Sequence, residues 1–358
     1  MKKNKGFSLV ELMVALVIGL LLIAGVIELF VSSRQMYRVQ DMKARMQEDG
    51  RYAVFRISKL LSRTGYLGCN SLQNSDGSEI TNTLNNADSY FWDFDVPLTG
   101  HKSNGDGSWS PALTDIPSVD KNSDVLTLRT VDEVYIQIDE HDVGGTDDAN
   151  VENYSAPLKI PATNGLTPCS TDKDNPKYKA TCSNIVMVSD CENTAIFQVT
   201  NDPSADGTLE HTVGGDASPG NSTPNLGATF RRGWLNTIAS HSFYVSAQSG
   251  TPSLYEKVGS NSAEVVVDGV ETMKVEYGID DDNDLNVDKY VNASGVTDWS
   301  KIISVRISLV MINIDVNQNT NVAVSNSTYL LNGVQYPSND GRLRQVFTKT
   351  IALRNRAL

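Results

Sequence analysis

The chain has 358 residues, which is longer than an average domain, although one elongated β-rich domain is able to use that length. Apolar residues make up 40% and charged residues 20%, enough for a sizeable core and too apolar for wholesale disorder. With 43 acidic and 30 basic side chains the net charge is -13. This balance argues against a protein that tracks nucleic-acid phosphates or docks on anionic lipid through a basic patch. Four cysteines and four scattered histidines leave few ligands for a metal enzyme.

The N-terminus predicts a membrane span. Three lysines precede Gly6, and an apolar run follows over residues 7–27. As a helix this run would extend about 32 Å, close to the ~30 Å hydrocarbon core of a bilayer. The lysines hold the short leader in the cytoplasm, so the residues beyond the span face outward. A secretory signal peptide is the alternative, but it places a small-residue cleavage site after the run, and residues 28–31 read ELFV.

Glu11 does not fit a plain membrane anchor. A carboxylate in a spanning helix costs roughly 2.5–3.5 kcal/mol. If the chain is cut between Gly6 and Phe7, Glu11 lies about one helical turn from a new α-amino group. Its carboxylate is then able to pair with the amine of a neighbouring subunit at low dielectric. In the alternative interpretation, Glu11 snorkels to the cytoplasmic interface beside the lysines.

The stretch KG-FSLVELMVALVIGLLLIAG resembles the class III leader and N-terminal helix of type IV pilins and type II secretion pseudopilins. In that family a membrane prepilin peptidase cuts after the glycine and N-methylates the next residue. The resemblance implies that residues 1–6 are a leader, that Gly6 is the recognition residue and that Phe7 becomes an N-methylphenylalanine. It also implies that Glu11 sets the registry between subunits.

Helical spacing continues beyond the span to about Arg63. Apolar residues recur every three or four positions while charged residues occupy other faces, which predicts one helix over residues 7–63. Residues 7–30 would be its transmembrane or filament-core part. The apolar stripe consists of Val39, Met42, Met46, Ala53, Ile57 and Leu60. We interpret this stripe as the seam on which a β-domain packs, with Gly50 as a weak point or kink. A coiled-coil dimer is the alternative.

Beyond residue 64 the composition predicts one elaborated β-domain, residues 64–358. Short β-branched and aromatic runs alternate with polar loops, and several of the loops are long enough to indicate surface insertions with a recognition role. The predicted strands are residues 124–131, 134–139, 185–189, 194–200, 243–246, 264–267, 273–277, 302–314 and 345–353. Asp268 and Gly269 stand between two of these runs and predict a tight hairpin turn.

Several short segments in this region resemble the PilW family of minor pilins. They are residues 65–69, residues 189–191, residues 265–278 and residues 346–355. The resemblance implies an α+β, type IV pilin-like fold, with a long N-terminal helix packed on an elaborated antiparallel β-sheet domain. It also implies a minor pilin that helps initiate assembly of a type IV pilus and caps it.

The same resemblance implies partners and a location. The partners are the other minor pilins and the major pilin, prepilin peptidase, the inner-membrane assembly platform and a PilY-type tip adhesin, and no nucleic acid. The chain would cross the inner membrane once, with its C-terminal domain in the periplasm, and then reach the pilus tip at the cell surface. A GspJ-like pseudopilin shares every N-terminal feature and is one alternative. A membrane-anchored periplasmic binding or hydrolytic domain is the other.

All four cysteines lie outside the membrane by the orientation argument. An even number in an oxidising compartment predicts two disulfides, and four cysteines allow three pairings. We favour Cys69 with Cys191, which would tie the helix end to a strand, and Cys169 with Cys182, which would close a loop. A four-cysteine zinc site is the alternative, but no paired C-x-x-C motif is present.

An aspartate-rich segment resembles the start of a calcium-binding loop. Asp280, Asp282, Asp284 and Asp288 stand at alternate positions and offer oxygen ligands. Leu285 replaces the usual glycine, and a valine replaces the bidentate glutamate. A calcium site and a solvated acidic hairpin tip are both open interpretations, and calcium is the one cofactor considered.

No sequence motif indicates catalysis. The chain has no G-x-S-x-G, H-E-x-x-H, Walker or dinucleotide motif, and we expect the four histidines to be exposed in polar loops. Asp93 and Asp95 flank Phe94 in an aromatic patch over residues 90–94. Such a carboxylate pair would suit a glycosidase, whereas the aromatic residues suit a packing corner or an anchor for a partner subunit. We expect no enzyme.

Overall fold

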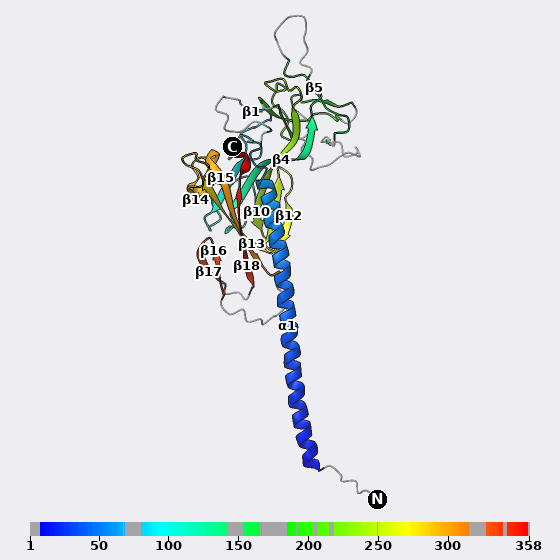
Figure 1. The fold of residues 1–358 in the computed structure, drawn as a ribbon, viewed down its shortest axis with the longest axis vertical. Helices are drawn as coiled ribbons and strands as arrows, with labels where there is room; N and C mark the ends of the chain where they lie inside the picture. Colours follow the sequence, from blue (N-terminus) through cyan, green and yellow to red (C-terminus); the bar gives the residue numbers. More distant parts are fainter. Residues whose placement is uncertain are drawn as a thin grey trace.

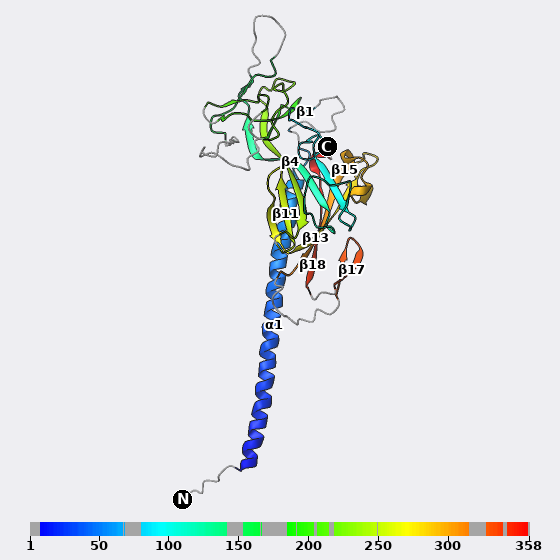
Figure 2. The same cartoon turned by 180° about the vertical axis from the view of Figure 1, so that it is seen from behind.

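A long helix projects from a β-rich body that gathers around its C-terminal end (Figure 1). The computed structural model describes residues 8–66, 68, 80–141, 153–164, 166, 185–190, 192–203, 206–214, 218–248, 250–314, 327–338 and 342–356. The N-terminus lies at the free end of the helix, far from the strands (Figures 1 and 2).

Helix α1 (Leu9–Leu61) runs uninterrupted for 53 residues, which confirms the single long helix expected over residues 7–63. No proline breaks its sequence, and long apolar side chains favour the helical backbone. At its end the side chain of Thr64 donates to the carbonyl of Leu60 (3.1 Å). The Asn355 amide donates to the carbonyls of Ser62 and Thr64 at 3.4 and 3.3 Å, so the C-terminal residues satisfy the last turn of the helix.

Only the last third of α1 is buried by the β-domain. Its buried residues are Met46, Gly50, Ala53, Val54, Ile57, Ser58, Leu60 and Leu61. They include four of the six stripe residues, so the stripe is the seam between helix and sheet, as predicted. Burying the six large and small apolar side chains among them contributes on the order of 10 kcal/mol, as an upper limit.

Most described strands form one large sheet in the order β1-β8-β7-β10-β4-β2-β3, with β11 and β12 continuing from β10. All its pairings are antiparallel except β1 with β8. Its members are β1 (Ile80–Asn82), β2 (Leu98–Ser103), β3 (Trp109–Ser110), β4 (Val125–Gln137), β7 (Ile185–Ser189), β8 (Thr194–Gln198), β10 (Trp234–Ser246), β11 (Ser253–Val258) and β12 (Glu264–Asp268).

A second antiparallel sheet has the order β14-β13-β15-β18. Two small sheets, β5-β6-β9 and the hairpin β16-β17, complete the described strands. The bounds are β13 (Val270–Ile279), β14 (Lys289–Val291), β15 (Ile302–Ile312) and β18 (Arg344–Ala352) for the second sheet, and β5 (Glu140–His141), β6 (Leu158–Lys159), β9 (Thr208–Leu209), β16 (Ser327–Leu331) and β17 (Val334–Ser338) for the small ones. Three short 3-10 helices are Ala293–Gly295, Trp299–Lys301 and Arg354–Arg356.

Strands β4 and β10 join two apolar cores. The first half of β10, Trp234 to Thr237, pairs with β7, and its second half, His241 to Ser246, pairs with β11. The core beside the second half contains α1, β2, β11, β12 and the second sheet. The core beside the first half contains β6, β7, β8 and β9. We call the part around this second core the distal lobe, because it lies at the end of the molecule opposite the N-terminus (Figure 1).

Two predicted features differ from the structure. Residues 124–131 and 134–139 were expected as two strands, but β4 runs through Asp132 and Glu133 as one strand. Asp268 and Gly269 do not close a hairpin, because β12 pairs with β11 while β13 pairs with β14 and β15. Gly269 has a φ of 78° and directs the chain from one sheet into the other.

Candidate assembly interface

Glu11 lies in the first turn of α1, where its carboxylate completes the helix start. Its Oε2 accepts a hydrogen bond from the backbone N–H of Ser8 at 3.0 Å. A negative charge at this end is stabilised by the helix dipole. Within the described residues Oε1 accepts no hydrogen bond, so it is able to accept one from an amine. Gly6 and Phe7 lie outside the described residues.

The first half of α1 exposes an apolar surface. From Leu9 to Val31 all large apolar side chains are exposed, with Leu9 at 75% and Phe30 at 70%. The most apolar 18-residue window has a mean hydropathy of 2.9, and none of it is buried. By length and composition this is the one described helix able to cross a membrane. An apolar surface of this size is stable only in a bilayer or against other apolar helices.

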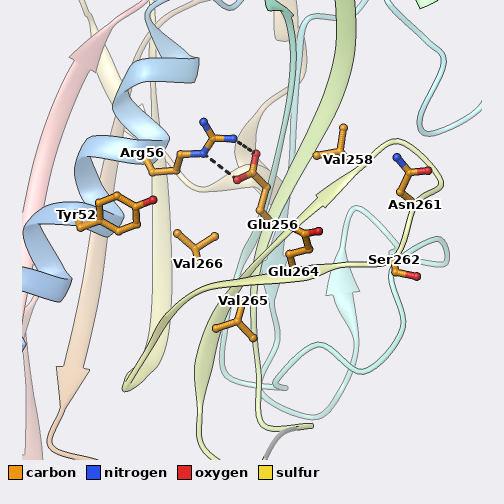
Figure 3. Close-up of a pocket in the computed structure, with 9 residues that line it drawn as sticks. All are labelled: Tyr52, Arg56, Glu256, Val258, Asn261, Ser262, Glu264, Val265 and Val266. Atoms are coloured by element: carbon orange, nitrogen blue, oxygen red, sulfur yellow. Dashed lines mark hydrogen bonds and ion pairs between the residues drawn. The ribbon is translucent and has the colours of Figure 1, made fainter. Parts of the chain in front are cut away.

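Further along, an ion pair attaches α1 to the large sheet (Figure 3). The guanidinium of Arg56 donates to both carboxylate oxygens of Glu256 on β11, at 2.9 and 2.8 Å. Nδ1 of His241 on β10 lies 2.7 Å from Oε1 of the same carboxylate. Burial raises the pKa of Glu256, but hydrogen bonds from His241 and Arg56 and their positive charges outweigh burial and hold that pKa below its ordinary value. The helix is therefore fastened by a charged link as well as by its apolar seam.

Sequence reasoning missed this link. Arg56 stands on a polar face of the predicted helix, and Glu256 lies 200 residues away. No spacing connects the two, and the pairing exists only because β12, which contacts α1, pairs with β11 and brings Glu256 within reach of Arg56.

A groove of about 430 Å³ opens next to the ion pair. Tyr52 and Arg56 form its helix wall, and Glu256, Val265 and Val266 lie among the residues of its sheet wall (Figure 3). Strand β12 is at the edge of the large sheet, since it pairs only with β11 among the described strands. The groove marks the place where the helix and this edge strand diverge.

Gly50 lies directly against the second sheet. The helix continues through this residue without a break, and the expected weak point or kink stays a prediction. A Cβ on Gly50 would overlap the ring of Phe347 on β18, so a larger residue requires that ring to move. The glycine therefore serves packing.

Two comparisons with known protein families agree with this architecture. Residues 1–27 match the model of the prokaryotic N-terminal methylation motif, and residues 242–355 match the model of type IV pilus-assembly protein W. These two matches support a PilW-family type IV minor pilin. No curated protein and no solved structure matches the chain.

The PilW match covers a defined part of the structure. It begins in the second half of β10 and ends after β18, so it contains β12, β15 and β18, which contact α1, but not β4, which also contacts the helix. The distal lobe lies almost entirely outside the match. The chain therefore joins the helix and the matched region to a lobe that lies outside the match.

The aspartate loop connects β13 and β14 as a hairpin. One carboxylate oxygen from each of Asp280, Asp282 and Asp288 lies within 4.8 Å of the others, and Asp280 is buried. Desolvation and repulsion from nearby carboxylates raise the pKa of Asp282, although its side chain is exposed. An all-oxygen set of this kind fits a hard cation such as Ca²⁺, and these three residues would hold it.

The fourth predicted ligand, Asp284, is not in that group. Its carboxylate accepts hydrogen bonds from the side chain and backbone of Asn286, which lower its pKa. Leu285 has a φ of 67°, the backbone conformation for which glycine is usual at this position. Calcium binding stays a prediction.

The histidines are buried, so the expectation of exposed loop histidines is wrong. All four have an exposed fraction of 6% or less. Nε2 of His141 and Nε2 of His211 both lie within hydrogen-bond distance of the carbonyl of Ala156, at 3.1 and 3.0 Å. Burial lowers the pKa of His211 and of His101. In this chain these rings hold loops together within the distal lobe and the sheet.

The aromatic patch is part of the core. Trp92 and Phe94 are buried, and the hydroxyl of Tyr90 lies 2.6 Å from Oγ1 of Thr127. The patch is therefore a packing corner in which Trp92 and Phe94 are not available to anchor a partner, whereas Tyr90 and Phe91 are half-buried. Asp93 and Asp95 are carried on the same corner, Asp95 exposed and Asp93 half-buried.

The predicted disulfides lie outside the described residues. Cys69, Cys169, Cys182 and Cys191 all stand in undescribed segments, so the pairings Cys69–Cys191 and Cys169–Cys182 stay predictions.

Proposed function

We propose that this protein is a minor pilin that helps initiate assembly of a type IV pilus and caps it. One observation carries the proposal. A β-domain is attached only to the last third of a 53-residue helix whose first half is bare and apolar, and the methylation motif stands at the start of that helix. A helix built this way has two stable environments, a bilayer before assembly and a bundle of like helices afterwards.

The assembly step follows from the charges at the helix start. Cleavage between Gly6 and Phe7 creates an α-amino group one turn from Glu11. Inside a helix bundle an unpaired carboxylate is costly, so Glu11 favours the position in which it meets the amine of a neighbouring subunit. The pairing selects one position of each helix along the filament axis relative to its neighbour. It places no requirement on the β-domain.

The distal lobe supports a place at the tip. In a filament whose helices point their N-termini toward the base, a further subunit would stack above the β-domain. In this chain the distal lobe extends beyond the C-terminal end of α1 into that space (Figures 1 and 2). A lobe there hinders stacking from above while leaving the bare helix free to contact subunits below.

Partners and location follow from this role. The helix would meet the other minor pilins and the major pilin, prepilin peptidase would process the leader, and the inner-membrane platform would insert the subunit. The β-domain would lie in the periplasm before assembly and at the filament tip afterwards, where a tip adhesin is the expected neighbour. The role is structural and requires no catalysis.

The test is the number of copies per filament. Filaments are sheared from cells, separated by length, and the ratio of this protein to the major subunit is measured by quantitative mass spectrometry. A tip subunit gives a constant number per filament, so its ratio falls in inverse proportion to length. A ratio independent of length would place the chain along the shaft, and its confinement to the envelope would indicate a pseudopilin or another membrane-anchored role.

A further inference from the structure

Charge is divided sharply between the helix and the β-domain. Between residues 34 and 63 the chain has 8 basic and 3 acidic side chains, whereas beyond residue 63 it has 19 basic and 38 acidic ones. An overall charge of -13 therefore conceals a basic segment of α1 beside a strongly acidic domain.

Three of the basic residues share one face of α1. At about 100° per residue, Arg38 and Arg45 lie within roughly 40° of Arg34 around the helix. All three are exposed, and Arg45 pairs with Asp41 at 3.2 Å in an exposed contact of little energy. Among the described residues Arg34 and Arg38 make no ion pair. We call Arg34, Arg38 and Arg45 the arginine strip.

The arginine strip lies between two surfaces that are already assigned. The apolar stretch ends at Val31, and the chain's own β-domain first contacts α1 at Met42, through Asn313, and buries another face of the helix from Met46 onward. The strip extends about 16 Å along the helix in this interval. It is continuous with the apolar stretch, so whatever packs on the apolar stretch in a filament also approaches the strip.

We propose that the arginine strip docks the acidic β-domain of another pilin-like subunit, placed one step nearer the membrane. This inference rests on the proposed function. The charge of the occupant follows from complementarity, and this chain shows that a subunit of this design carries an acidic β-domain. The direction follows from geometry, because the strip lies on the N-terminal side of the chain's own domain. The two faces of this interface differ, so the contact favours an arrangement in which this chain lies farther from the membrane than its partner.

A lipid surface explains the strip less well. Attraction to anionic headgroups fades within a Debye length of about 8 Å. Arg34 is about 5 Å beyond the end of the apolar stretch, but Arg45 is about 21 Å beyond it. A planar headgroup layer reaches only the start of the strip, whereas the side of a protein domain reaches all of it.

Photo-crosslinking in cells tests the inference on the full-length protein. Tyr37 is exposed and lies about 60° from Arg34 and about 100° from Arg38 around the helix, at the border of the strip, so a photoreactive benzoylphenylalanine at this position reports what packs there. Membranes and sheared filaments are both analysed after irradiation. We expect an adduct with an acid-rich surface segment of another pilin-like subunit. An adduct with lipid only, or with a protein segment lacking an excess of acidic residues, overturns the inference.

Charge-reversal variants supply the matched comparison. Arg34→Glu with Arg38→Glu should lower the adduct yield roughly tenfold, and Arg34→Lys with Arg38→Lys should retain most of it. Lys43→Glu with Arg51→Glu changes the net charge equally, but these exposed residues lie on other faces of α1, so the yield should persist. Equal losses in both reversal variants contradict a specific strip.

If the unaltered chain reaches filaments and its adduct does not depend on these arginines, this inference fails while the proposed function stands. If the unaltered chain never enters filaments, the proposed function fails.

Discussion

Replacing Arg56 with methionine tests how the helix is fastened to the β-domain. Methionine keeps much of the aliphatic contact but removes both hydrogen bonds to Glu256, leaving that carboxylate with His241. Charge-assisted hydrogen bonds contribute about 1.5–3 kcal/mol each when buried. The Arg56 side chain is 34% exposed, so solvent screening reduces the expected loss to about 2 kcal/mol in all. For a domain of this size the thermal midpoint should fall by about 4 °C.

The assay is thermal unfolding of the full-length protein in detergent, followed by near-ultraviolet circular dichroism. Arg51→Met is the matched control, because Arg51 is an exposed arginine on the same helix. We expect the control to change the midpoint by less than about 1 °C. Equal effects of the two substitutions would refute a specific contribution from the Arg56–Glu256 pair.

The pH dependence of the difference in thermal midpoint between the unaltered protein and Arg56→Met gives an independent check. The pKa of Glu256 in the folded protein lies below its ordinary value of 4.5, so its contribution is present above pH 4.5 and is lost as the pH falls through the folded-state pKa. The gap between the unaltered protein and Arg56→Met should narrow as the pH is lowered below 4.5. A gap that stays constant down to pH 3 would contradict the role of the ionised carboxylate.

Four further predictions follow. Glu11→Val should leave the chain cleaved and stable but poorly incorporated, because registry is lost; recovery from filaments at the normal level would contradict the pairing with the amine. Gly50→Ala should lower the free energy of unfolding by at least about 1 kcal/mol more in the unaltered protein than in a Phe347→Ala variant, because the Phe347 ring leaves no room for a Cβ. Equal changes in the two proteins, measured by denaturant unfolding, would exclude that contact. Millimolar Ca²⁺ should raise the thermal midpoint and Asp282→Asn should cancel the rise, whereas no rise would leave the loop a solvated hairpin. A reductant should lower the midpoint if two disulfides form, and four free thiols by mass analysis would contradict them.

The sequence predicted the helix well because its signal is local. An apolar run of membrane length and a stripe at helical spacing are both visible without knowledge of the partner surface, and α1 begins two residues later than expected. Its attachment was only partly predictable. The stripe indicated which face packs, but the contacts of Gly50 with Phe347 and of Arg56 with Glu256 depend on strands distant in sequence.

Strand β10 shows why part of the sheet was missed. Only residues 243–246 were expected as strand, yet β10 runs from Trp234 to Ser246. Asn236, Ser240 and His241 interrupt the apolar pattern, and all three are buried. A strand that passes between two cores and carries buried polar residues does not alternate regularly between apolar and polar side chains. A search for apolar residues at every second position therefore detects only its end.

Burial of the histidines and aromatics was the least predictable feature. Polar neighbours in sequence suggested exposed loops for the histidines, but the distal lobe folds loops over its core, so His141 and His211 meet at one carbonyl. The tight-turn prediction at Gly269 was right about a positive φ and wrong about the pairing, because turn residues specify a local backbone and not which sheet each strand joins.

A subunit that enters a filament after processing carries a shortened and methylated N-terminus. Mass spectrometry of surface filaments, sheared and purified from cells, would identify the N-terminal peptide of the protein. We expect a peptide that begins at a methylated Phe7 in the filament fraction. Protein found only in the envelope with Met1 intact would exclude a processed filament subunit and leave a simple membrane anchor.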